Sequence, residues 1–222
     1  MATEIEIKRV LDAAGYARLQ AHLDTLASPR RHEQVNHYLD LADAALNKAG
    51  AMLRLRVVGD RLVLTLKARS SVSDGVLRTQ ELEQELTTEE DKAFWQHLPV
   101  AWQQAAIRLG DWLDTTGLHA VGTHDGTLVE IGQTLNLRLA YKLPKGIPGW
   151  PHALTLELDH TQFPGGVERL ELELEHPDAA ELAPVLNAWL TGLDVATSPA
   201  TETKYAQFLR LAGLKTTNAD PM

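Results

Sequence analysis

Charged and apolar residues alternate one by one in several stretches of this chain, and a period of two is typical of β-strands. The first stretch lies near the start, where Glu4, Glu6 and Lys8 alternate with Ile5 and Ile7. The pattern returns over residues 53–56, 64–67, 81–85, 157–159 and 171–175. Because successive side chains of a strand point to opposite faces, each stretch predicts a strand with one charged and one apolar face.

The alternation and the turn-forming residues together predict a succession of strands. We expect strands over residues 3–11, 33–41, 51–58, 61–69, 77–86, 135–142, 153–159 and 169–175. Three or four strands are expected in all between Leu118 and Asp159. Gly59-Asp60 predicts a short hairpin turn, residues 70–75 a polar loop, and Gly165-Gly166 a further turn.

Four helical segments are expected among these strands. Asp12 is the predicted N-cap of the first, which ends before Ser28-Pro29. Its apolar side is formed by Tyr16, Leu19, Leu23 and Leu26. A second segment is expected over residues 87–108, with an interruption at a proline, and a third over 178–190. The fourth is expected to open with Ser198 as N-cap and a proline at the first helical position.

Composition narrows the class of protein. The 222 residues, 44% of them hydrophobic, predict one domain over residues 1–214 and a tail over 215–222. A formal net charge of −9 argues against general binding to nucleic acid or to a membrane surface, so a basic site should be local and enclosed. The sequence has no cysteine, no signal-peptide pattern and no apolar run of about 18 residues. We expect a cytoplasmic monomer or homodimer.

The charged faces of the strands could point to solvent, which is the ordinary arrangement of an antiparallel sheet. The distribution of sign favours a different arrangement. Arg54, Arg56 and Lys67 lie on one predicted hairpin whose only acidic residue is Asp60 in the turn, whereas carboxylates dominate the first, fifth and late strands. A barrel closed around the charged face, with helices over the apolar face, would set a cationic wall against an anionic wall.

Such an interior is costly when empty, because buried charges lose their hydration. It becomes favourable when carboxylates hold divalent cations and the basic wall holds a polyanion, since phosphate oxygens pair well with Arg and Lys. The charge pattern therefore predicts an enclosed site for a metal and a phosphate-rich ligand.

The order of these motifs resembles the CYTH, or triphosphate tunnel metalloenzyme, superfamily over nearly the whole chain. Its hallmark E-x-E-x-K motif is matched by Glu4, Glu6 and Lys8. Further matches are, in chain order, residues 36–40, 53–56, 64–68, Arg78 ahead of Glu81 and Glu83, residues 171–175, and residues 203–205. The chain is most similar to the short single-domain triphosphatases of the superfamily.

The resemblance implies an α+β fold, in which a closed, eight-stranded antiparallel β-barrel with a charged interior is surrounded by helices and binds a triphosphate with Mg²⁺ or Mn²⁺. The implied phosphate contacts are Lys8, Arg54, Arg56, Lys67, Arg78 and Lys204. The implied metal ligands are Glu4, Glu6, Glu81, Glu83, Glu173 and Glu175. Catalytic roles fall to Lys8, Arg56, Glu4 and Glu6. Glu85 and Glu171 are either further ligands or rim charges, and Glu157 and Asp159 are weaker candidates.

One departure concerns the strand expected near residues 121–131, where the similar short proteins carry a further arginine and this chain has no basic residue. Arg138 and Lys142 share one face of the next strand and are the candidates to replace it. Arg138 is included among the expected substrate contacts.

The expected reaction is metal-dependent hydrolysis of a triphosphate, with inorganic tripolyphosphate preferred because no pocket for a base or thiazolium is evident. In this hypothesis one cation bridges the phosphates, while a second cation or a carboxylate prepares water for in-line attack. A class IV-type adenylyl cyclase, a thiamine triphosphatase, and a non-enzymatic module that binds polyphosphate or organic phosphates are the alternatives.

Overall fold

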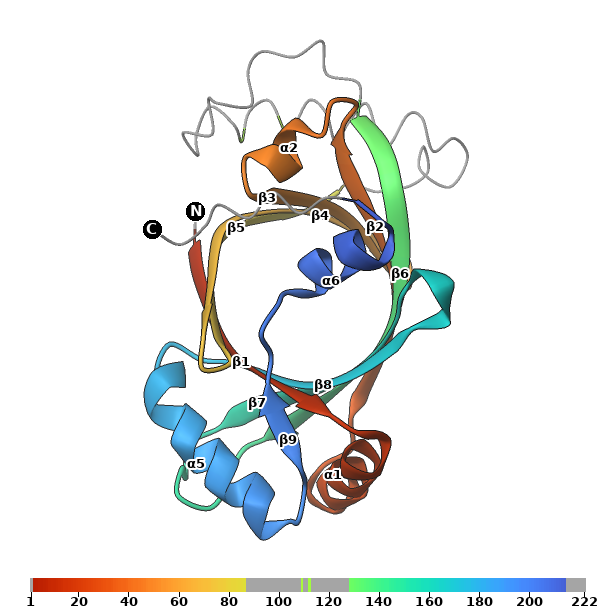
Figure 1. Cartoon of the computed structure of the whole chain (residues 1–222). Helices are drawn as coiled ribbons and strands as arrows, with labels where there is room; N and C mark the ends of the chain where they lie inside the picture. The colour runs from red at the N-terminus through yellow and green to blue at the C-terminus, as the bar shows by residue number, and fades with distance from the viewer. Residues whose placement is uncertain (1, 87–108, 110–111, 113–127, 215–222) are drawn as a thin grey trace.

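The strands close into a barrel. The computed structural model describes residues 2–86, 109, 112 and 128–214. Within these residues one nine-stranded sheet has the order β5-β4-β3-β2-β6-β7-β8-β1-β9, and β5 also pairs with β1. The β5–β1 pairing joins the ends of eight strands, and every pairing is antiparallel (Figure 1). The prediction of an α+β fold with a closed eight-stranded barrel is confirmed, with β9 as an additional strand.

The element boundaries follow the alternating pattern closely. The strands are β1 (Ala2–Leu11), β2 (Arg30–Leu41), β3 (Ala51–Val58), β4 (Arg61–Ser73), β5 (Val76–Glu85), β6 (Leu128–Leu143), β7 (Leu154–Gln162), β8 (Glu168–Glu175) and β9 (Thr197–Pro199). The helices are α1 (Ala13–Leu26), α2 (Ala45–Lys48), α5 (Ala179–Gly192), α6 (Lys204–Leu211) and a short 3₁₀ turn (Pro164–Gly166). The helix predicted over 87–108 and the tail over 215–222 lie outside the described residues.

The apolar faces of the strands point outward and are covered by helices. Ile7 of β1 and Leu172 of β8 are fully buried in a cluster with Leu19 of α1 and Leu186 of α5. Figure 1 shows α1 and α5 packed outside the β1, β7 and β8 side of the barrel. A second cluster covers β2, β3 and β4 beneath α2. Burial of this apolar surface stabilises the barrel from outside and leaves the charged faces inside. On the apolar side of α1, Leu19 and Leu23 are fully buried, whereas Leu26 at the end of the helix is 51% exposed.

The polar loop predicted over residues 70–75 is instead part of a longer hairpin. β4 continues to Ser73, because a bulge at residues 69–70 lets the strand bend and keep pairing with β5. The turn itself is Asp74-Gly75, and both residues have positive φ. A Cβ at Gly75 would lie 2.1 Å from Nη1 of Arg9, which donates to the carbonyl oxygens of Lys8, Asp74 and Gly75. Glycine therefore lets the hairpin tip pack against β1.

The last helix begins later than predicted. Ser198 and Pro199 belong to β9, where Ser198 pairs with Val10 of β1, and the helix has Thr203 as N-cap. Thr203 accepts a hydrogen bond from the backbone N–H of Ala206 at 3.1 Å. Both Ser-Pro and Thr-Glu-Thr suit a helix start, and the unpaired edge of β1 decides between them. Because the start shifts, Lys204 becomes the first helical residue, and α6 lies across the barrel opening in Figure 1.

Within the residues that the structure describes, no helix is both long enough and apolar enough to span a membrane.

Candidate functional site: a charged tunnel

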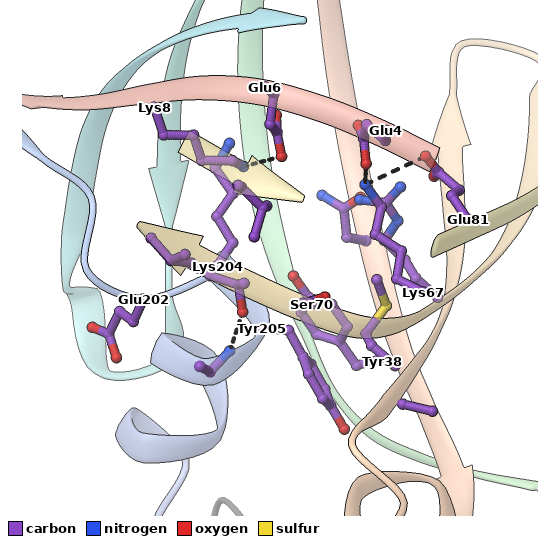
Figure 2. Close-up of a pocket in the computed structure, with 18 of the residues that line it drawn as sticks. Glu4, Glu6, Lys8, Tyr38, Lys67, Ser70, Glu81, Glu202, Lys204 and Tyr205 are labelled. Atoms are coloured by element: carbon purple, nitrogen blue, oxygen red, sulfur yellow. Dashed lines mark hydrogen bonds and ion pairs between the residues drawn. The ribbon is translucent and has the colours of Figure 1, made fainter. Parts of the chain in front are cut away.

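Strand alternation places the motif of β1 inside the barrel. Figure 2 shows Glu4, Glu6 and Lys8 projecting from β1 toward the same space, with Lys67 of β4 reaching toward Glu4. Glu6 and Lys8 are almost fully buried and lie 3.2 Å apart. Ile7 points the other way into the outer core. The inward charged face predicted from the sequence is therefore present.

The barrel encloses a cavity of about 1830 Å³. The inner faces of the barrel strands contribute most of its charged lining, and α6 and the segment before it contribute residues at one end. The charged lining residues are Glu4, Glu6, Lys8, Arg54, Arg56, Lys67, Arg69, Glu81, Glu83, Arg138, Glu157, Glu173, Glu175, Glu202, Lys204 and Arg210. Of the predicted phosphate contacts and metal ligands, all but Arg78 lie in this one cavity.

Arg54 and Arg56 form a basic wall on β3. Nε of Arg56 donates to Oδ1 of Asn36 at 3.2 Å, and Nη2 of Arg54 donates to the hydroxyl of Thr65 at 3.3 Å. Within the described part of the chain, neither arginine makes an ion pair, and Nε of Arg54 has no hydrogen-bond acceptor. Burial, then the charges of Arg54 and Arg138, lower the pKa of Arg56 to about 9. The hydrogen-bond partners of this wall among the described residues are neutral amides and hydroxyls, and the more distant charges of Glu83 and Asp159 only partly offset the lowering of the Arg56 pKa.

The opposite wall is a network of ion pairs around two carboxylates. Glu173 accepts hydrogen bonds from Lys8 at 2.6 Å, Lys204 at 2.7 Å and Arg138 at 2.5 Å. Asp159, which is fully buried, accepts two from Arg138 at 2.8 and 2.6 Å and a further one from Lys204. These five residues come from β1, β6, β7, β8 and α6. The network therefore joins segments that are far apart in sequence.

Burial opposes each of these charges, and the ion pairs outweigh it. Lys204, Lys8 and Arg138 hold the pKa of Glu173 well below its usual range despite burial. Against burial, Arg138 and then Lys204 lower the pKa of Asp159 to about 2. Despite burial, the carboxylates raise the pKa of Lys8, Arg138 and Lys204. The network is consequently fully charged at neutral pH.

A smaller cluster lies between β1, β4 and β5. Lys67 contacts Glu4, and its Nζ lies 3.5 Å from Oε2 of Glu81. Figure 2 marks both contacts with dashed lines. Despite burial, the charge of Lys67 lowers the pKa of Glu4, whereas burial outweighs Lys67 and raises the pKa of Glu81. One lysine therefore lies between two carboxylates. Its charge outweighs the effect of burial for Glu4 but not for Glu81.

The carboxylates of the tunnel suit a hard divalent cation by their chemistry but not by their present arrangement. Burial and the charges of Glu4 and Glu83 raise the pKa of Glu175, while burial and the charges of Glu173 and Glu4 raise that of Glu6 to about 7. Crowded carboxylate oxygens are the donors that Mg²⁺ prefers, and a cation would relieve their repulsion. Among the described residues, however, no three His, Asp or Glu side chains stand together as a complete ligand set. Binding would require these carboxylates to rearrange.

Two predicted basic residues lie away from the tunnel. Arg78 is exposed, pairs with the outward-facing Ile5 of β1 and does not line the cavity, so the structure does not bring it together with the other predicted phosphate contacts. The residue shares its face with Gln80, opposite to that of Glu81. Lys142 is also exposed and outside the lining, at the end of β6. Arg138, which lies four positions earlier on β6, does line the cavity.

The structure also shows where the less certain acidic candidates lie. Glu171 is fully buried, with Arg169 at 2.7 Å and Lys204 at 3.4 Å, so it belongs to the ion-pair wall. Glu85 is an exposed rim charge that lies 3.5 Å from Arg61. Asp159, a weaker candidate in the sequence analysis, lies at the centre of the ion-pair network.

Two residues that line the tunnel, Asn36 and Arg69, were not among the candidates predicted from the sequence. Asn36 orients Arg56 and lies opposite it in the β2–β3 register, which only strand pairing reveals. Arg69 lines the cavity, and a signal was present because it continues the alternation of Thr65 and Lys67. Its position at the predicted end of a strand concealed it.

A closed antiparallel barrel with opposed basic and acidic inner walls defines a charged β-barrel tunnel. The CYTH domain model matches residues 2–198, and the chain belongs to the CYTH family. Its expected resemblance is thereby confirmed.

Several solved structures are similar in fold over nearly the whole chain. HpAC1 from Hippeastrum, for which a dominant triphosphatase activity is reported, is 25% identical with a TM-score of 0.76, over 96% of this chain and 97% of that one. A proposed adenylate cyclase from Bacillus halodurans is 22% identical with a TM-score of 0.61, over 94% and 99%. The PH1819 protein from Pyrococcus horikoshii is 18% identical with a TM-score of 0.56, over 93% and 98%. Comparison with curated proteins gives no match.

Proposed function

We propose that this protein is a metal-dependent triphosphatase that hydrolyses inorganic tripolyphosphate to diphosphate and phosphate inside the tunnel. The observation that carries the proposal is the basic wall. Arg54 and Arg56 are half-buried, line the cavity, and make no ion pair among the described residues. Two such guanidiniums are costly without an anion and bind phosphate oxygens well. The triphosphatase activity of HpAC1 supports the same reaction class.

The two walls would take different parts in the reaction. Phosphate oxygens would bind Arg54 and Arg56 first, because these residues need not release a carboxylate. Lys8, Lys67, Arg138 and Lys204 could bind phosphate only by exchanging a carboxylate for it, which would free the carboxylates for a cation. Mg²⁺ or Mn²⁺ held by Glu4, Glu6, Glu81, Glu83, Glu173 and Glu175 would supply charge neutralisation and an acidified water. Fixed guanidiniums would stabilise charge that develops on the transferring phosphoryl group.

Aromatic residues at the α6 end of the cavity bear on the choice of substrate. Tyr38 and Tyr205 line the cavity and could in principle contact an organic group. Tyr38 is nevertheless buried, with its ring 4.6 Å from that of Phe208 and 5.2 Å from that of Tyr205. These rings hold α6 against β2, so they have a packing role already. The inorganic substrate is therefore favoured over a nucleotide or thiamine triphosphate.

The test is phosphate release by the purified protein from tripolyphosphate, ATP and thiamine triphosphate, each with Mg²⁺, Mn²⁺ or EDTA. We expect metal-dependent release that is greatest from tripolyphosphate. Resolution of the nucleotide products would reveal cyclic AMP if the protein were a cyclase. Greater release from either organic triphosphate would overturn the substrate assignment, and no turnover of any substrate would leave only a binding function.

A further inference from the structure

Arg169 is a buried arginine that does not line the cavity. It is 8% exposed and lies two residues before Glu171 on β8, on the same face of the strand. Its Nη1 donates to Oε1 of Gln207 at 2.6 Å, and its Nη2 donates to the carbonyl oxygen of Glu202 at 3.4 Å. Gln207 belongs to α6 and Glu202 precedes that helix. Arg169 therefore contacts the chain on both sides of Lys204 in the sequence.

Glu171 is the carboxylate that Arg169 faces. It is fully buried, and Nη2 of Arg169 lies 2.7 Å from its Oε1. Nζ of Lys204 lies 3.4 Å from its Oε2. Neither oxygen accepts a hydrogen bond from the part of the chain that the structure describes, so ion pairs alone balance this charge. A buried carboxylate in this state strongly attracts any cation within reach.

Lys204 reaches Glu171 and two further carboxylates. It lies 2.7 Å from Glu173 and also contacts Asp159, and both contacts are closer than its contact with Glu171. Unlike Arg169, Lys204 lines the cavity. Because lysine has a flexible stem and a rotatable ammonium group, a small rotation would carry its Nζ from Glu173 to Glu171. Arg169 opposes that movement, since it already neutralises Glu171.

The contacts of Arg169 with the start of α6 fix the direction of its guanidinium. Gln207 and the carbonyl group of Glu202 are neutral acceptors, so they orient Arg169 without neutralising it. Gln207 is also buried, at 8% exposed. Within the described ranges, the only ion pair of Arg169 is with Glu171. The positive charge of Arg169 is therefore directed at that one carboxylate.

We propose that Arg169 is a positioning residue that neutralises Glu171 and thereby keeps Lys204 directed into the tunnel. The inference rests on the proposed function only for the role of Lys204 as a phosphate contact. It goes beyond that function in assigning a role to two residues outside the cavity lining. Loss of Arg169 should move Lys204 toward Glu171, and removal of the Glu171 charge should reverse the movement.

The test is calorimetric binding of tripolyphosphate at neutral pH in the presence of EDTA. Arg169→Met removes the guanidinium and keeps an apolar stem, while Arg169→Met/Glu171→Gln removes both charges. Arg169→Lys keeps the charge beside Glu171 but cannot keep both contacts with the start of α6. Gln207→Met is the matched control, because it removes the shorter of these contacts and leaves the ion pair in place. Thermal unfolding checks that each variant is folded.

We expect Arg169→Met to raise the dissociation constant about ten-fold, the effect of losing one charged hydrogen bond. The double variant, Arg169→Lys and Gln207→Met should all stay within about two-fold of the native value. If Arg169 only held α6 in place, the double variant would bind as weakly as Arg169→Met, and Gln207→Met would also bind weakly. Either result would overturn the proposal. If Arg169→Met does not fold, weak binding by Arg169→Lys, or by the double variant relative to Glu171→Gln, overturns it instead.

A measurement without ligand separates this inference from the proposed function. Urea unfolding of Lys204→Met, Asp159→Asn and their double variant gives the coupling free energy between Lys204 and Asp159. This coupling should fall by about half or more in the Arg169→Met background and return when Glu171→Gln is added. A native protein that shows this loss of coupling but binds no tripolyphosphate would refute the proposed function alone. Unchanged coupling would refute the role of Arg169.

Discussion

The basic and acidic walls of the tunnel use buried charge in opposite ways. On β3, Arg54 and Arg56 lie side by side among amides and hydroxyls, and Arg56 has a lowered pKa. On β7 and β8, Asp159 and Glu173 are more deeply buried but share Arg138 and Lys204, and Glu173 also accepts a hydrogen bond from Lys8. The first wall has unsatisfied charge and the second has almost none. Charge that the fold leaves unpaired is available to a ligand, whereas paired charge also stabilises the barrel.

This difference explains how a chain of net negative charge can hold an anion site. The overall charge is −9, yet the tunnel separates its cations from its carboxylates along particular strands. The carboxylates near the cations Lys8, Arg138 and Lys204 neutralise them, so the local attraction for a polyanion comes mainly from β3 and the end of β4. A difference in stability and activity between substitutions in the two walls would test this division.

Removal of Arg138 should have the largest effect on stability. Arg138→Met leaves Asp159 and Glu173 with fewer partners in a buried site, and loss of one member of such a network costs about 3–5 kcal/mol. Arg56→Met is the matched control, because it removes a guanidinium of equal size that has no ion pair in the described structure and is repelled by Arg54 and Arg138. Its free energy of unfolding should stay within about 1 kcal/mol of the native value.

Urea unfolding at neutral pH measures both variants. Equal losses of unfolding free energy would mean that the two walls do not differ in ion pairing. A larger loss for Arg56→Met than for Arg138→Met would mean that the basic wall contributes more to stability than the acidic wall.

Removal of Arg56 should instead have the largest effect on turnover of tripolyphosphate. Arg56→Ala should lower kcat/KM by about 100- to 1000-fold, the loss typical of one fixed donor to a developing charge. Arg78→Ala is the control, because Arg78 is a strand arginine that lies outside the cavity, and it should change kcat/KM by less than about two-fold. Steady-state kinetics with tripolyphosphate and Mg²⁺ provide the measurement. Similar losses in both variants would reject the assignment of the basic wall.

The acidic wall should also give stability a dependence on acid pH. The pKa of Asp159 is about 2 in the folded protein, below its ordinary value of 3.8. A lowered pKa means that ionised Asp159 stabilises the fold, fully above about pH 4, and that this contribution is lost as the pH falls toward 2. The loss is about 2 kcal/mol. The free energies of unfolding of the native protein and of Asp159→Asn should therefore converge by about this amount between pH 6 and pH 2. A constant difference would contradict the network.

The fold and most of the tunnel lining could be predicted because both follow from local alternation. A period of two fixes which residues of a strand share a face, and the predicted strand over 51–58 has the observed bounds. Parity alone would also have placed Arg78 correctly on the outer face, with Gln80 rather than with Glu81. The pairings across the tunnel could not be predicted, because contacts such as Lys204 with Asp159 depend on the start of α6 and on closure of the barrel. A competing edge strand moved that helix start from Ser198 to Thr203.

The smallest expected effect concerns the N-cap of α6. Thr203→Ala removes the acceptor for the backbone N–H of Ala206 and should destabilise the protein by about 1 kcal/mol. Ser198→Ala should change stability by less than about 0.5 kcal/mol, since Ser198 is an exposed residue of β9 with no capping role. Because α6 presents Lys204 to the acidic wall, Thr203→Ala should also reduce the coupling free energy between Lys204 and Asp159 in a double-mutant cycle. No such reduction would show that the acidic wall holds Lys204 independently of the cap.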